Sequence, residues 1–205
     1  MVLNLNWNYH SHTLYTDGSH TVEEIASYCD GHGIKEIAIT EHVKRELSYD
    51  FDALLSDIKH ANSKFKVNII TGLEAKILPD GTLDCTEEIK SKVDIVIGSV
   101  HSLNGMDQYG AYEKLARSDC MIIGHPQLCS DKIIASMVST GKIVELSARY
   151  DQQDDMIMAF KEAGLLFSIG LDSHKLSELD DFDRVKEMIQ NFGLQDRLWK
   201  FTKNS

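Results

Sequence analysis

The feature that most constrains this chain is the alternation of short apolar runs with longer amphipathic segments. Seven runs are rich in β-branched or apolar residues, and the stretches between them space their apolar positions as a helix does. The runs span residues 5–9, 36–40, 67–75, 93–100, 120–124, 142–147 and 165–171. This alternation is typical of parallel β/α units, so the sequence predicts an α/β fold with seven parallel strands.

The segments between these runs are predicted to be helices. Thr21 is a suitable N-cap, Glu24 three residues later completes a capping box, and Gly33 is a suitable terminator. Helical spacing also occurs over residues 51–65, 130–140, 152–164 and 179–191, and in weaker form over 85–91 and 106–117. Periodicity alone leaves two architectures open, because an open doubly wound sheet and a closed barrel share this pattern.

Length and charge narrow the class of protein. The 205 residues suffice for one domain with a substantial core, so we expect a single domain over residues 1–205. The formal net charge of -11 disfavours nucleic acid as a partner, since that affinity comes mainly from Lys and Arg. The sequence shows no signal peptide, no apolar run long enough for a membrane span and no C-x-x-C pair. We therefore expect a cytoplasmic protein that does not enter a membrane; its oligomeric state stays open.

Metal-ligating side chains follow the predicted strands. Six of the nine histidines fall at strand ends, and carboxylates join them there. The residues at these positions are His10, His12, His42, Glu74, His101, His125, Asp172 and His174. Because the carboxyl ends of the strands in a barrel surround one pocket, such a set is expected to meet there.

A pocket lined by so many imidazoles and carboxylates would be electrostatically costly without cations. Residues i and i+2 of a strand share a face, so His10 and His12 can point at one ion. Pro126 is expected to hold His125 in an extended conformation. Imidazole and carboxylate ligands without an evident thiolate indicate Zn, Mn or Fe. We expect two or three divalent ions, with Glu74 as the bridge because its two oxygens can bind separate metals.

In order along the chain, these motifs resemble those of the PHP (polymerase and histidinol phosphatase) superfamily of metal-dependent phosphoesterases. The motifs are "HSH" at 10–12, "TDG" at 16–18, "TEHV" at 40–43, "GLE" at 72–74, "GSVHS" at 98–102, "GHP" at 124–126 and "GLDSH" at 170–174. The resemblance covers nearly the whole chain. It implies a distorted (β/α)7 TIM-like barrel with a trinuclear metal site, in agreement with the seven predicted strands.

The resemblance also implies how the ligands are shared among the metals. The first metal would be held by His10, His12, Glu74 and Asp172, the second by Glu74, His101 and His125, and the third by Asp17, His42 and His174. Some relatives have histidine at the position of Asp17. A carboxylate is a harder ligand there, so the third ion is expected to be the labile one.

The activity implied by the resemblance is that of a phosphoric ester hydrolase in which a metal-bound hydroxide attacks phosphorus. We expect Glu74, Asp172 and Arg149 to be catalytic, with Arg149 clamping the phosphate through its planar fork. Lys44 and Lys175 are further candidates for contacts with the substrate. The alternative for Arg149 is a surface ion pair with Glu145 or Asp151. The short chain favours a small phosphorylated metabolite, such as histidinol phosphate, a nucleotide or a sugar phosphate.

The sequence has features in common with three other functions. A 3′-5′ exonuclease uses similar chemistry but fits the net negative charge less well. An amidohydrolase barrel also begins with H-x-H, but it would want a bridging lysine at the fourth strand and an eighth strand. A non-catalytic PHP module would be expected to have lost ligands, whereas every motif here keeps one.

Overall fold

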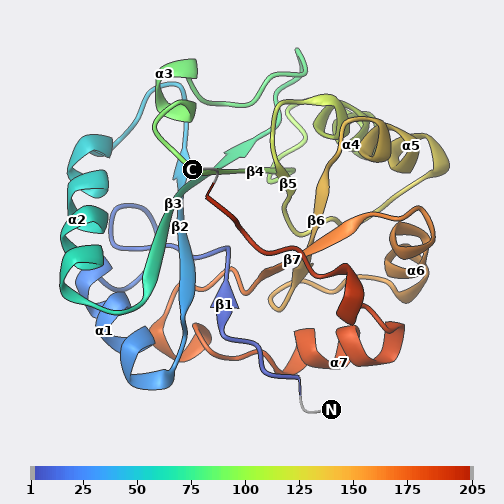
Figure 1. Cartoon of the computed structure of the whole chain (residues 1–205). Coiled ribbons are helices and arrows are strands. Elements are labelled where there is room, and N and C mark those ends of the chain that lie inside the picture. Colours follow the sequence, from blue (N-terminus) through green and yellow to red (C-terminus); the bar gives the residue numbers. More distant parts are fainter. Residues whose placement is uncertain (1–2, 204–205) are drawn as a thin grey trace.

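A computed structural model of the chain describes residues 3–203 and shows seven strands that curve into a nearly closed barrel (Figure 1). The strands are β1 (Trp7–Asn8), β2 (Glu36–Val43), β3 (Asn68–Lys76), β4 (Ile95–Ser99), β5 (Ile122–Ile123), β6 (Ile143–Ser147) and β7 (Leu166–Gly170). They are hydrogen-bonded in sequence order and every neighbouring pair is parallel. The predicted TIM-like α/β barrel is confirmed, because a doubly wound sheet would not keep the sequence order.

Helices follow the strands and cover the outside of the barrel (Figure 1). They are α1 (Val22–His32), α2 (Phe51–Lys64), α3 (Glu87–Lys90), α4 (Gln108–Arg117), α5 (Asp131–Ser139), α6 (Asp154–Glu162) and α7 (Asp183–Phe192), with 3-10 turns at Leu176–Glu178 and Gln195–Arg197. The predicted capping box of α1 is present, and Gly33 ends that helix with a φ of 76°. Each helix in the described part of the chain is too short or too polar to cross a membrane.

The seam between β1 and β7 is closed partly by a side chain. Backbone bonds join Tyr9 N–H to Ile169 O at 2.9 Å and His12 N–H to Ser173 O at 2.9 Å. Between them, the fully buried Asn8 amide accepts the N–H of Leu171 at 3.0 Å and donates to Ser173 Oγ at 3.1 Å. Asn8 therefore replaces part of a strand ladder, two residues before His10, the first of the predicted ligands.

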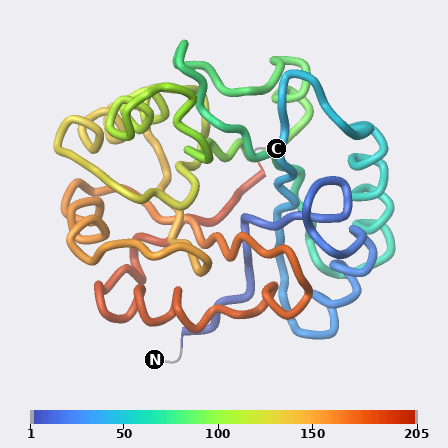
Figure 2. The backbone as a smooth tube through the Cα atoms, turned by 180° about the vertical axis from the view of Figure 1, so that it is seen from behind, coloured from blue at the N-terminus to red at the C-terminus, as the bar shows by residue number. Residues whose placement is uncertain are grey.

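The amino ends of the strands are closed by the C-terminal segment. Figures 1 and 2 show this segment in red, running from α7 into the middle of the barrel. Trp199 donates its N–H to Phe167 O at 2.8 Å, and its ring meets Tyr9 edge-on with centroids 5.2 Å apart. The opposite end, at the carboxyl ends of the strands, is left for the polar side chains.

Replacement of Asn8 by Ala should lower the free energy of unfolding by about 1–3 kcal/mol, because the buried N–H of Leu171 loses its acceptor. Denaturant unfolding followed by circular dichroism measures the change. Asn191→Ala, at an exposed position of α7, is the matched control and should alter stability by less than about 0.5 kcal/mol. Equal stability of the two variants would show that Asn8 does not hold the seam.

Candidate metal centre

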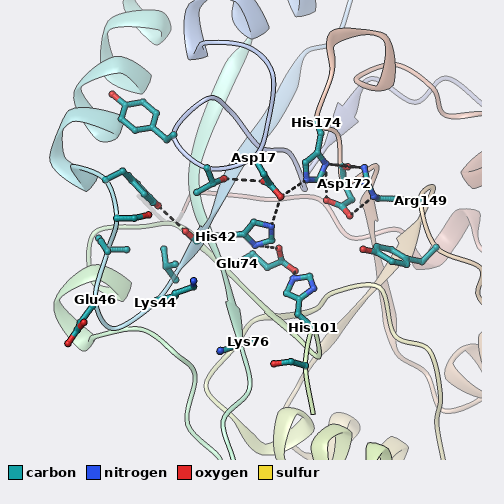
Figure 3. Close-up of a pocket in the computed structure, with 18 residues that line it drawn as sticks. Asp17, His42, Lys44, Glu46, Glu74, Lys76, His101, Arg149, Asp172 and His174 are labelled. Atoms are coloured by element: carbon teal, nitrogen blue, oxygen red, sulfur yellow. Dashed lines mark hydrogen bonds and ion pairs between the residues drawn. The ribbon is translucent and has the colours of Figure 1, made fainter. Parts of the chain in front are cut away.

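The nine predicted ligands meet in one cluster at the carboxyl ends of the strands (Figure 3). His42 and Glu74 lie near the carboxyl ends of β2 and β3. The other seven lie in the segments that follow β1, β4, β5 and β7. Three groups have donor atoms within 4.8 Å of one another. They are His12, Asp17, His42 and His174; His10, His12 and Asp172; and His42, Glu74 and His101.

Glu74 lies at the centre of this cluster and is almost completely buried. Its Oε1 is 2.8 Å from His101 Nε2 and 3.0 Å from His125 Nε2. Its Oε2 is 2.9 Å from His42 Nδ1 and 3.4 Å from His10 Nε2. The strand register explains the contact between Oε2 and His42, since His42 and Glu74 are opposite each other in the β2–β3 pair. Two oxygens that face different histidines have the geometry that a bridging carboxylate needs.

Several buried nitrogen and oxygen atoms of the cluster have no hydrogen-bond partner among the described residues. They are Nε2 of His10, both ring nitrogens of His12, and Oε2 of Glu74. The nearby contacts lie within ion-pair distance but lack hydrogen-bond geometry. Buried polar atoms without partners are costly and rare in proteins. Lone pairs of imidazole and carboxylate that converge in this way fit divalent metal ions.

The pKa values reflect how tightly the charges are packed. Burial works to raise the pKa of Glu74, but His10 and the surrounding imidazoles hold it well below its usual range. Asp172 behaves in the same way, because His10 and His12 outweigh its burial and lower its pKa. Burial lowers the pKa of His12 to about 4. A neutral His12 beside ionised carboxylates is the state in which these groups bind a cation.

The loop that carries Asp17 is held from two sides. The buried Glu41 carboxylate accepts the N–H of Thr13 at 2.6 Å and the hydroxyl of Thr16. Gly18 packs against the backbone of His12 so closely that a Cβ there would lie 2.4 Å from the His12 carbonyl oxygen. Asp17 itself remains 54% exposed, far more than Glu74 or Asp172. That an ion bound at Asp17 would be the labile one stays a prediction.

Glu145 is a site residue that the sequence analysis missed as such. It lies in β6, it is 1% exposed, and its Oε2 accepts the Nδ1–H of His10 at 2.6 Å. This bond directs the Nε2 lone pair of His10 toward Glu74 and Asp172, as partners of metal-ligating histidines do. Gly170 makes room for it, because a Cβ there would lie 2.3 Å from the Glu145 carboxyl carbon. A glutamate inside the apolar run 142–147 was the available signal.

Two of the candidate ligands, His125 and Asp172, have a left-handed backbone, and only His125 was predicted to be extended. Despite the following Pro126, His125 has a φ of 29°, and Asp172 has a φ of 48°. The prediction of an extended His125 was therefore wrong. His125 turns so that its ring reaches Glu74 while its N–H lies 3.3 Å from Glu145 Oε1. Left-handed conformations of this kind are costly for residues other than glycine and cluster at functional sites.

Arg149 lies beside the cluster, with Nη1 3.1 Å from His174 Nδ1 and Nε 3.6 Å from Asp172 Oδ2 (Figure 3). Neither alternative ion pair forms in the described structure, since Glu145 binds His10 and Asp151 pairs with Arg184.

A cavity of about 570 Å³ opens above the ligands, and Arg149 and Lys44 line it together with Tyr15, Tyr49 and Tyr150. Lys175 is exposed and lies outside this lining, although the sequence analysis expected it to contact the substrate. The contact of Lys175 with substrate stays a prediction; the backbone N–H groups of His174 and Lys175 both bond Oε2 of Glu178, at 2.7 and 3.2 Å.

The family model of the PHP domain matches residues 8–194. The chain belongs to the PHP family. It is 29% identical over 197 residues to the DNA polymerase/3′-5′ exonuclease PolX of Bacillus subtilis, covering 84% of this chain. It is 25% identical over 213 residues to a protein of Thermoanaerobacter sp. named "Probable phosphatase", covering 92% of this chain and 87% of that protein. The PHP chain spans 35% of the length of the Bacillus enzyme.

A solved structure with the same fold is the histidinol phosphate phosphatase of Lactococcus lactis, complexed with zinc, L-histidinol and phosphate. The TM-score is 0.71 at 20% identity, and the match covers 93% of this chain and 95% of that one. At this identity the likeness shows the fold alone.

Glu74→Gln in this PHP domain should lose metal while the barrel stays folded, because an amide offers one neutral oxygen where the cluster requires two charged ones. Metal content per chain after dialysis against zinc measures the loss. Glu88→Gln, an exposed change in α3, is the control and should keep the wild-type content. Wild-type metal content in Glu74→Gln would refute the bridge.

Glu145→Gln should weaken metal binding by about 10–100-fold, the scale for the partner of a ligating histidine. Competition between the PHP domain and a chelator of known affinity measures it. Glutamine has nearly the same volume as glutamate, so circular dichroism of Glu145→Gln should show an intact barrel. An unchanged affinity would show that Glu145 only fills space below His10.

Proposed function

We propose that this PHP domain hydrolyses small phosphomonoesters with the help of two or three divalent ions, of which Zn, Mn and Fe are the candidates. The observation that carries the proposal is the arrangement around Glu74, where buried ring nitrogens of His10 and His12 and one oxygen of Glu74, without hydrogen-bond partners among residues 3–203, converge below an open cavity. When bound, divalent ions supply Lewis acidity for phosphate ester hydrolysis. The PHP family of this chain and the relatives named as probable phosphatases support this activity.

The protein's own residues prepare the site for a phosphate. Glu74 and Asp172 supply the negative charge that holds the cations, and Glu145 fixes the orientation of His10. Arg149 is 44% exposed and its guanidinium borders the cavity, so its fork is available to phosphate oxygens. Binding there would place the phosphate between a fixed positive charge and the metal ligands. Lys44 lines the same cavity and is a second cation within the site.

A small phosphorylated metabolite is favoured over nucleic acid because the chain carries a net charge of -11. The lining also forms a cavity of about 570 Å³, a size typical of small-molecule sites. Histidinol phosphate, nucleotides and sugar phosphates remain candidates. The single domain over residues 1–205 and the cytoplasmic location stay predictions.

A 3′-5′ exonuclease is the second candidate function. The observation in its favour is the 29% identity to the Bacillus polymerase/exonuclease, which exceeds that to the phosphatases. A screen separates the two. Metal-free protein is supplied with Zn, Mn or Fe(II) and assayed on phosphomonoesters, on a phosphodiester and on single-stranded DNA. Turnover of monoesters supports the first function, turnover of DNA alone supports the second, and turnover of none of them refutes both.

Arg149→Ala should leave metal content and folding unchanged and lower kcat/KM for phosphomonoesters by roughly 10²-fold, the scale for a donor that stabilises a transition state. Arg149→Lys should recover part of this loss, since a point charge cannot reproduce the fork. Steady-state kinetics on glycerol 3-phosphate measures both variants. Wild-type kcat/KM in Arg149→Ala would show that the phosphate is held without it.

A further inference from the structure

Two lysines stand next to each other at the carboxyl ends of β2 and β3. In this parallel pair His42 is opposite Glu74 and Val43 is opposite Ala75, so Lys44 and Lys76 are next in register. They follow the metal-facing pair by two positions and share its face. Both line the cavity, and Figure 3 draws them on the far side of His42 and Glu74 from Arg149.

Like charges in neighbouring positions of a sheet are destabilising, so the pair needs compensation. Lys76 Nζ is 3.5 Å from Asp84 Oδ2, a contact that occupies one of its three donors. Lys44 forms no ion pair with a carboxylate of residues 3–203. The adjacent Arg45 turns away from the cavity, toward Thr82 at 2.8 Å and Asp80 at 3.5 Å. Two lysines therefore line one side of the cavity in an otherwise acidic protein.

We propose that Lys44 and Lys76 form a subsite for a second anionic group of the substrate. The preferred substrates are then phosphomonoesters whose leaving group carries a carboxylate or a further phosphate. The inference rests on the proposed function, because the reacting phosphate must lie near Arg149 and the metal ligands for the second group to reach the lysines. The cavity of about 570 Å³ is large enough for a substrate of this kind.

Glu46 lines the same cavity and is the competing feature. A subsite dominated by its carboxylate would select a leaving group with an amine. The two possibilities differ in the sign of the charge on the leaving group of the substrate. Matched substrates can therefore separate them.

The test compares 3-phosphoglycerate with glycerol 3-phosphate, which differ by a carboxylate in place of a hydroxymethyl group. The zinc-loaded wild-type protein should show about tenfold higher kcat/KM for 3-phosphoglycerate, the scale of one charge-assisted hydrogen bond. Lys44→Met and Lys76→Met should each reduce this ratio, and added salt should reduce it as well. Lys35→Met is the matched control, because Lys35 precedes β2 at the opposite end of the barrel. It should keep the wild-type ratio.

The affinity of the protein for the same two compounds, measured by calorimetry, tests the subsite even without turnover. Tighter binding of 3-phosphoglycerate with no hydrolysis of either compound by the Zn-, Mn- or Fe(II)-loaded protein would count against the proposed function and support the subsite. Equal kcat/KM and equal affinity for the two compounds in wild type would overturn the subsite and leave the hydrolase intact. Faster turnover of phosphoethanolamine than of 3-phosphoglycerate would also overturn it, and would assign the subsite to Glu46.

Discussion

The site and much of the fold depend on the environment of one buried carboxylate, that of Glu74. A carboxylate removed from water requires donors or positive charge around it. Here the surrounding imidazoles come from four strand ends, and they belong to His10, His12, His42, His101 and His125. One side chain on β3 is therefore stabilised only when β1, β2, β4 and β5 are all in register. Closure of the barrel therefore both stabilises the Glu74 carboxylate and assembles the candidate metal site.

Strand register carries this requirement across the molecule. The register that sets His42 against Glu74 ends at Val43 and Ala75, and the residues that follow them, Lys44 and Lys76, both line the cavity. At the seam, Asn8 fixes the strand end from which His10 projects. A slip of one residue in any of these pairs would turn the ligands out of the cavity, because successive side chains of a strand face opposite sides.

The sequence predicted the seven strands and the nine candidate ligands that the structure brings together, because both follow from local patterns, namely alternating apolar runs and polar residues at their ends. It overestimated β1 and β5, which are two residues long each. Glu145 could not be assigned because its partner, His10, lies 135 positions away. The left-handed backbone of His125 was missed for a related reason, since long-range contacts to Glu74 and Glu145 override the local effect of Pro126.

The two ends of the barrel differ in their roles: the amino ends of the strands stabilise the fold, and the carboxyl ends form the candidate site. At the amino ends of the strands, Trp199 and Tyr9 close the barrel with aromatic contacts and backbone hydrogen bonds, which stabilise the fold. At the carboxyl ends, buried nitrogens with no hydrogen-bond partner in the described part of the chain and the left-handed backbone of His125 and Asp172 all cost stability. A site for divalent cations must keep such lone pairs unsatisfied by the protein itself. The closed apolar end therefore offsets the cost of the open polar one.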